Sequence, residues 1–292
     1  MERGNLTDQQ WERLQPLLPP QRTGKRGRPP RPHREVLNGI LWILRTGSPW
    51  RDLPATYPPF GTCHSRLSRW QACGIWERIL QALQGEADAA GQLDWRHVSL
   101  DSTTVRAHQH SAGARRTPAE AGSEKGGADQ PSTREALGRS RGGLTTKIHL
   151  AGDGRGKPLA VVITPGQWHD STQLEPVLCR IRVPRRRGRP RQRPDRLVLD
   201  KGYSYPKCRR LLRRRGIRHV IPERRDQREQ RQRKGMRGGR PCHFEPEVYR
   251  ERNWIERLIN RLKQWRRVAT RYEKRAENFR AMVLIACLLL WL

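Results

Sequence analysis

Acidic residues are scarce in this chain. It has 28 Asp and Glu against 60 Lys and Arg in 292 residues, which gives a formal net charge of +32. Because so large a surplus of one sign opposes compaction by self-repulsion, a polyanion is expected to neutralise it. Nucleic acid is the partner that this charge favours, through strong and salt-dependent binding. An anionic membrane is the alternative, but the cations are spread along the whole chain and are not gathered on one amphipathic helix.

Long apolar runs and cysteine patterns are also missing. The C-terminal run AMVLIACLLLWL has twelve residues, fewer than the roughly 20 needed to span a bilayer, so we interpret it as a buried terminal helix. The N-terminus lacks the apolar core of a signal peptide. The six cysteines form no CxxC pair and no zinc-ligand spacing. Reduced thiols in a cytoplasmic protein, with no membrane partner, are therefore expected.

The first part of the chain, residues 1–90, predicts a helical domain. LTDQQWERLQPLLP and HREVLNGILWILRTG both have helical periodicity, and short apolar segments between Gly and Pro turns follow them. One of these segments carries His64, Arg66 and Arg69 together. The pattern resembles a helix-turn-helix module, so we predict that these three residues contact DNA. A purely structural helical bundle is the alternative.

Strand patterns begin at residue 97. HVSLDST, KIHLAGD, PLAVVITPG, RLVLDKGY and HVIP each predict a strand, the second and third forming a hairpin, and helical segments separate the later ones. The order β, ββ, α, β, α, β, α predicts a mixed sheet flanked by helices over residues 91–292. Two segments are expected to lie outside it, a flexible excursion at 107–143 and a basic loop at 222–246.

Two predicted strands end in an aspartate, VSLD at Asp101 and LVLD at Asp200. Carboxylates at strand ends gather at one edge of a sheet, where the active sites of open α/β folds lie. The alternative is that each aspartate only starts a turn. His169 and Asp170 also follow a strand directly, and they are expected to start the next helix, which has a capping box from Thr172 to Glu175. A position near the phosphates is the secondary interpretation of this pair.

The segment YRERNWIERLINRLK predicts one helix that could bring a third acid to the same place. Tyr249, Arg252, Glu256 and Lys263 fall within an arc of roughly 60° beside an apolar stripe. The alternative is a solvated helix with one Arg252–Glu256 pair.

Three carboxylates that converge in a partly buried place repel one another, and a pair of divalent cations removes that cost. Hard oxygen ligands favour Mg²⁺ or Mn²⁺. Two such ions about 3.5–4 Å apart suit an in-line displacement at phosphorus. His108 and His110 are weaker metal candidates because their segment is rich in Gly and Ser. The chain contains no GxSxG, Walker loop or HExxH motif.

Several segments resemble one known family. DSTTVRAHQH, GRSRGGLTTKIHL, LVLDKGY, GIRHVIP and the spacing Y-x2-R-x3-E-x6-K are similar to DDE transposases of the IS4/IS5 insertion-sequence superfamily. WILRTGSPWRDLP and RWQACGIWERI resemble the helical domain of its IS5-type members. The insertion domain of many IS4-type members is missing, since only about 30 residues separate HVIP from the last motif.

The resemblance implies an RNase H-like catalytic domain in which Asp101, Asp200 and Glu256 hold two Mg²⁺ or Mn²⁺ ions. Tyr249, Arg252 and Lys263 would be the accompanying phosphate-binding residues. The implied protein is a nucleoid-associated transposase that binds inverted-repeat ends as a homodimer on double-stranded DNA, cleaves them and joins their 3′-hydroxyls to target DNA. Two alternatives stay open, a non-catalytic repressor derived from a transposase and an RNase H-like nuclease without strand transfer.

Overall fold

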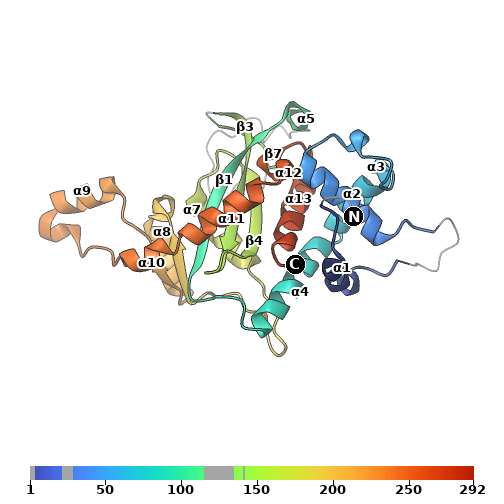
Figure 1. Cartoon of the computed structure of the whole chain (residues 1–292). Coiled ribbons are helices and arrows are strands. Elements are labelled where there is room, and N and C mark those ends of the chain that lie inside the picture. The colour runs from blue at the N-terminus through green and yellow to red at the C-terminus, as the bar shows by residue number, and fades with distance from the viewer. Residues whose placement is uncertain (1–3, 22–28, 115–134, 141) are drawn as a thin grey trace.

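The computed structural model describes residues 4–21, 29–114, 135–140 and 142–292 (Figure 1). Its first part is helical, as the sequence predicted. Thr7 caps the first helix by accepting a hydrogen bond from the backbone N–H of Gln10, and Gly47 ends the second with a positive φ of 74°. The helices are α1 (Asp8–Leu14), η1 (Gln15–Leu17), α2 (His33–Thr46), η2 (Trp50–Asp52), α3 (Phe60–Ala72) and α4 (Ile75–Ala89).

A mixed sheet forms the second part. Its path runs β2-β3-β1-β5-β6, with β4 also paired to β3 and β7 to β1. β1 is antiparallel to β3, and β3 to β4, while β1, β5 and β6 are parallel. This is the RNase H-like arrangement that the sequence predicted. The strands are β1 (Val98–Ala107), β2 (Gly138–Ser140), β3 (Gly143–Gly152), β4 (Pro158–Pro165), β5 (Arg196–Leu199), β6 (Arg218–Val220) and β7 (Thr270–Arg271).

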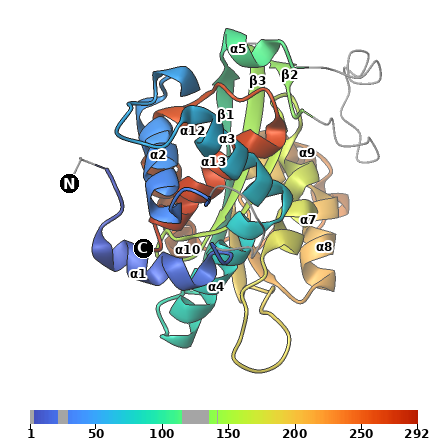
Figure 2. The same ribbon diagram turned by 90° about the vertical axis from the view of Figure 1, so that its right-hand side faces the viewer.

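Helices cover both faces of this sheet. α11 lies across β1 in Figure 1, and in the turned view α7 lies on the other side of the strands from α13 (Figure 2). The remaining elements are α5 (Gln109–Ala112), α7 (Asp170–Arg180), η3 (Lys201–Tyr203), α8 (Pro206–Arg214), α9 (Arg225–Arg233), η4 (Gly235–Gly238), α10 (Pro246–Arg250), α11 (Asn253–Lys263), α12 (Arg266–Ala269) and α13 (Ala276–Leu289).

The apolar C-terminal segment is a buried helix, as predicted. α13 packs against α3 and α4 on one side and against β4 and α12 on the other. Its side chains from Phe279 to Leu288 are buried, except Arg280, and they belong to one hydrophobic core that runs from the helical part into the sheet. Within the described ranges, no helix is long and apolar enough to cross a membrane.

Three local expectations were wrong. β1 does not end at Asp101 but continues to Ala107, because β3 pairs with it along the whole length. The segment 222–246 is not only loop, since it contains α9, which has no buried residue. α7 is capped by His169, whose side chain accepts from the backbone N–H of Ser171, and not by a Thr172–Glu175 capping box.

The helix expected over 249–263 is interrupted. Between α10 and α11 the backbone N–H groups of Arg252 and Ile255 donate to carbonyls three residues back, which tightens the turn. Tyr249 therefore lies on α10, and Arg252 caps α11. Most of the excursion expected at 107–143 lies outside the described residues. Its described ends form α5 and β2.

Phe279 tests how strongly α13 holds the two parts together. Its ring is fully buried, so Phe279→Ala is expected to lower the free energy of unfolding by about 3–5 kcal/mol, through lost burial and the cavity left behind. Urea denaturation followed by circular dichroism measures it. Glu277→Ala, at an exposed position of the same helix, should change stability by less than about 0.5 kcal/mol. Equal effects of the two substitutions would contradict this role of α13.

Candidate active site

Asp101 and Asp200 lie side by side where two parallel strands separate. Leu100 of β1 pairs with Leu199 of β5, so the next residue on each strand is an aspartate. β5 ends there, and the carboxylate of Asp200 accepts the backbone N–H of Gly202 at 3.0 Å. The backbone pairing thus brings together the two acids that the sequence placed at strand ends.

α11 contributes the third acid through an arginine. The guanidinium of Arg252 bridges Asp101 and Glu256, with 2.5 Å to Oδ2 of Asp101 and a short contact to Oε1 of Glu256. The side chains of Arg252 and Asp101 are each 16% exposed, whereas that of Glu256 is 52% exposed. The apolar face of α11 fixes this position because Ile255 and Leu258 are buried against β1 and β3.

Burial controls the protonation of the two aspartates. Desolvation raises the pKa of Asp101 from 3.8 to about 6; the Arg252 guanidinium opposes this rise, and the negative charges of Asp200 and Asp170 add to it. Burial also raises the pKa of Asp200. The Arg252 guanidinium lowers this pKa, and the negative charge of Asp170 raises it. The acids therefore repel one another in a partly dry place and favour a cation beside them.

Asp170 is a fourth acid beside Asp101 and Asp200, whereas its sequence predicted chiefly a helix start. Its Oδ1 accepts from Ser102 Oγ at 2.8 Å and from Lys147 Nζ at 3.0 Å. Ser102 directly follows Asp101 on β1, so Asp170 ties the start of α7 to the strand that carries the first catalytic candidate. The available signal was an acid directly after a strand and at a helix N-terminus, where a carboxylate is stabilised.

His149, on β3, lies next to Asp170 of α7. Its Nδ1 is 3.8 Å from Asp170 Oδ1, but burial lowers its pKa to about 4. The ring is therefore neutral at pH 7, and the contact is not an ion pair. Lys147 is left as the cation that pairs with Asp170.

Tyr249 lies on α10, and Lys263 lies on the same helix, α11, as Glu256. Burial raises the pKa of Tyr249; the Arg252 guanidinium opposes this rise, and the charges of Asp200, Glu256 and Asp101 add to it. Lys263 is half-buried at the C-terminal end of α11, about 10 Å along the helix axis from Glu256 at 1.5 Å per residue.

The three residues expected to contact DNA through α3 differ in exposure. Arg69 is exposed and His64 is half-buried beside Trp50, with ring centroids 5.2 Å apart. Arg66 is only 5% exposed, and its guanidinium lies 2.5 Å from Nδ1 of His33. In this structure Arg66 supports the interior of the helical part, so we do not retain it as a DNA contact.

A divalent metal ion would use oxygen donors that are present here. In the described part of the chain, no group of three or more His, Cys, Asp or Glu side chains is arranged so that it could hold a metal ion. Arg252 supplies the positive charge instead, and its buried Nε has no hydrogen-bond partner. The donor set nevertheless fits a hard cation, because the acids lie on adjacent elements and Asp101 is poorly solvated.

Two family models match the chain. "Putative transposase of IS4/5 family" matches residues 6–80, and "Transposase DDE domain" matches residues 94–291. The chain therefore belongs to the DDE transposases of the IS4/IS5 superfamily. This agrees with the resemblance seen in the sequence.

Individual proteins are similar over shorter stretches. "Uncharacterized protein y4sN" of Sinorhizobium fredii is 42% identical over 40% of this chain and 87% of its own length. "Putative transposase for insertion sequence element IS402" of Burkholderia cepacia is 35% identical over 50% of this chain and 62% of its own length. A "pre-cleavage Mos1 transpososome" structure matches 84% of this chain and 80% of its own at 9% identity, but its TM-score of 0.25 supports no conclusion.

The raised pKa of Asp101 gives a pH-dependent stability. The folded state binds this proton more tightly than the unfolded state. The cost of ionising the buried carboxyl is therefore absent below about pH 4, grows between about pH 4 and pH 6, and is fully present above that range. Asp101→Asn should therefore gain stability relative to wild type, by about 3 kcal/mol, between pH 4 and pH 7.5. Urea denaturation in a chelator measures this difference. Asp52→Asn, at an exposed position, should show no comparable pH dependence; a pH-independent effect of Asp101→Asn would refute the assignment.

Proposed function

We propose that this chain is an insertion-sequence transposase that cuts DNA phosphodiesters at the ends of its element and transfers the 3′-hydroxyls to target DNA. The observation that carries the proposal is the pairing of β1 with β5, which places Asp101 beside Asp200. Arg252 links Asp101 to Glu256. The three acids of the Asp-Asp-Glu pattern thus belong to one connected group.

Asp101, Asp200 and Glu256 would hold two Mg²⁺ or Mn²⁺ ions. When bound, these ions supply activation of the attacking hydroxyl and stabilisation of the leaving oxygen. Asp101 lies on β1 and Asp200 directly follows β5, so the pairing of the two strands brings them close before DNA binds. Glu256 is more exposed and comes from α11, so it completes the set from the opposite element.

Arg252 has a second role in this proposal. In the structure its guanidinium neutralises Asp101 and Glu256. With the acids neutralised by bound cations, the Arg252 guanidinium would be free to bind a phosphate. Its planar group can donate two parallel hydrogen bonds to phosphate oxygens. Tyr249, on α10, and Lys263, at the far end of α11, would position the same strand. Because hydrolysis and strand joining are both in-line displacements at phosphorus, one site serves both steps.

The helical part would recognise the inverted repeats, with His64 and Arg69 of α3 as contacts. Two ends must be held together for joining, so we propose a homodimer on DNA. Because Lys and Arg outnumber Asp and Glu, the DNA-binding constant should fall as salt is added. The expected fall is about 0.9 log units per phosphate contact for each log unit of salt concentration.

Glu256→Gln separates chemistry from binding. We expect DNA ends to bind with unchanged affinity, because Glu256 is paired to Arg252 and does not support the core. Mg²⁺-dependent nicking should fall by roughly a thousandfold, equivalent to about 4 kcal/mol. Gel assays of binding and nicking on the DNA that flanks the coding region measure both. Glu247→Gln, at an exposed acid of α10, is the matched control and should nick normally.

The same assay distinguishes the alternatives. A wild-type protein that binds these ends but never nicks them with Mg²⁺ or Mn²⁺ would be a repressor. A protein that nicks but yields no covalently joined product with target DNA would be a nuclease without strand transfer. Either result would overturn the proposed function.

Asp170→Asn tests the fourth acid, which the sequence did not predict as a catalytic residue. The carboxylate joins Lys147 to Ser102 beside Asp101, so its loss should loosen the orientation of Asp101. We expect nicking to slow about 10–100-fold, the usual effect of an outer partner of a metal ligand, with DNA affinity unchanged. A raised Mg²⁺ requirement in the same assay would separate this positioning role from misfolding. Full activity at low Mg²⁺ would exclude it.

A further inference from the structure

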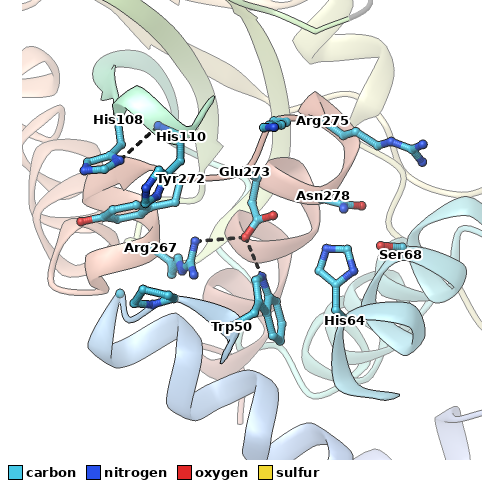
Figure 3. A pocket seen from close by; sticks show the side chains of 13 residues that line it. Trp50, His64, Ser68, His108, His110, Arg267, Tyr272, Glu273, Arg275 and Asn278 are labelled. Carbon is cyan, nitrogen blue, oxygen red and sulfur yellow. Dashed lines mark hydrogen bonds and ion pairs between the residues drawn. The ribbon is translucent and has the colours of Figure 1, made fainter. Parts of the chain in front are cut away.

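A cleft of about 760 Å³ lies between the helical part and the C-terminal end of β1. We name it the α3–α13 cleft. Figure 3 shows His64 and Ser68 of α3 on one side and His108, His110 and Tyr272 on the other, with Arg275 at the start of α13. The walls therefore come from segments far apart in the sequence, and none of these residues belongs to the acid cluster.

The cleft is lined by cationic and imidazole groups. Lys274 and Arg275 are exposed at its edge, and three histidines line the walls. Among the described lining residues Glu273 is the one acid, and it is already bound to Arg267 and to Nε1 of Trp50, both at 3.2 Å (Figure 3). Its charge is thus neutralised within the protein, and the open side of the cleft favours an anion.

Two polar atoms in the lining residues lack a partner. Oγ of Ser68 and Nε of Arg267 are buried and form no hydrogen bond in the described structure. Buried polar groups are usually satisfied, so such exceptions suit a place that another molecule completes. Hydroxyl, imidazole, ammonium and guanidinium groups around one opening are the donors with which proteins contact DNA phosphates.

The position of the cleft relates it to the acid cluster. β1 runs from Asp101 to Ala107, and His108 follows directly. Six residues of extended strand span about 20 Å, which is the length of about six nucleotides along one DNA strand. We propose that the α3–α13 cleft holds the phosphodiester backbone of the substrate DNA about six nucleotides from the bond that is cut. This inference rests on the proposed function for its substrate.

Neutralising the edge of the cleft tests the proposal. The variant is Lys274→Gln with Arg275→Gln, and the control is Arg213→Gln with Arg214→Gln, an exposed neighbouring pair on α8 outside the cleft. Each full-length protein is compared with wild type on duplex DNA from the flanks of the coding region. Hydroxyl-radical footprinting locates the protected nucleotides, and Kd is measured at several salt concentrations. His64→Gln is a second cleft variant, and thermal melting checks that all variants fold.

For the cleft pair we expect Kd to rise about tenfold and the salt slope to fall by about 2, as for two lost phosphate contacts. Protection should disappear over one short stretch about six nucleotides from the nick and persist elsewhere, while the control keeps the whole footprint. An unchanged footprint, or a loss spread evenly over the duplex in both pairs, overturns the proposal. If the wild-type protein binds the DNA but does not nick it, the proposed function is wrong, and local loss of protection in the cleft variant still tests the cleft. If the wild-type protein does not bind the DNA, both the proposed function and the role of the cleft are wrong.

Discussion

Repulsion between carboxylates held on adjacent backbone segments is the constraint on which the site depends. The pairing of β1 with β5 places Asp101 and Asp200 directly after a paired position, and the negative charge of Asp170 adds to their repulsion. Desolvation makes the ionised forms costlier still, so a positive group must stand beside them. In the structure that group is Arg252, which α11 brings to the acids from outside the sheet.

The position of Arg252 is itself a consequence of packing. The tightened turn between α10 and α11 directs its side chain toward β1, and the buried residues Ile255, Leu258 and Leu262 hold α11 on the sheet. α13 then connects this assembly to the helical part through a shared core. Burial of apolar side chains therefore maintains a polar arrangement that would not persist by its own electrostatics.

The sequence predicted what depends on local pattern. Alternation and turn residues predicted the strands, and the aspartates after VSL and LVL predicted that Asp101 and Asp200 meet at the sheet. The register that brings them together, Leu100 with Leu199, and the continuation of β1 past Asp101 were not predicted. The sequence did not predict what depends on tertiary partners. Arg66 looks like a DNA contact on its own helix, but His33 from another helix holds it inside. Asp170 looks like a helix start until Lys147 and Ser102, from two other strands, meet it. α9 was missed because it buries no side chain and so has no apolar period.

Strand β1 relates the acid cluster to the α3–α13 cleft. It pairs with β3 along its length, with β5 at the start and with β7 at the end, where the chain reaches the cleft. Because hydrogen bonds to three neighbours hold β1 extended, the strand sets a spacing of about 20 Å between Asp101 and its end at Ala107. DNA has a similarly regular spacing of phosphates along each strand. If the chain cuts DNA as we propose, this spacing would set which phosphate is cut by its distance from the contact in the cleft.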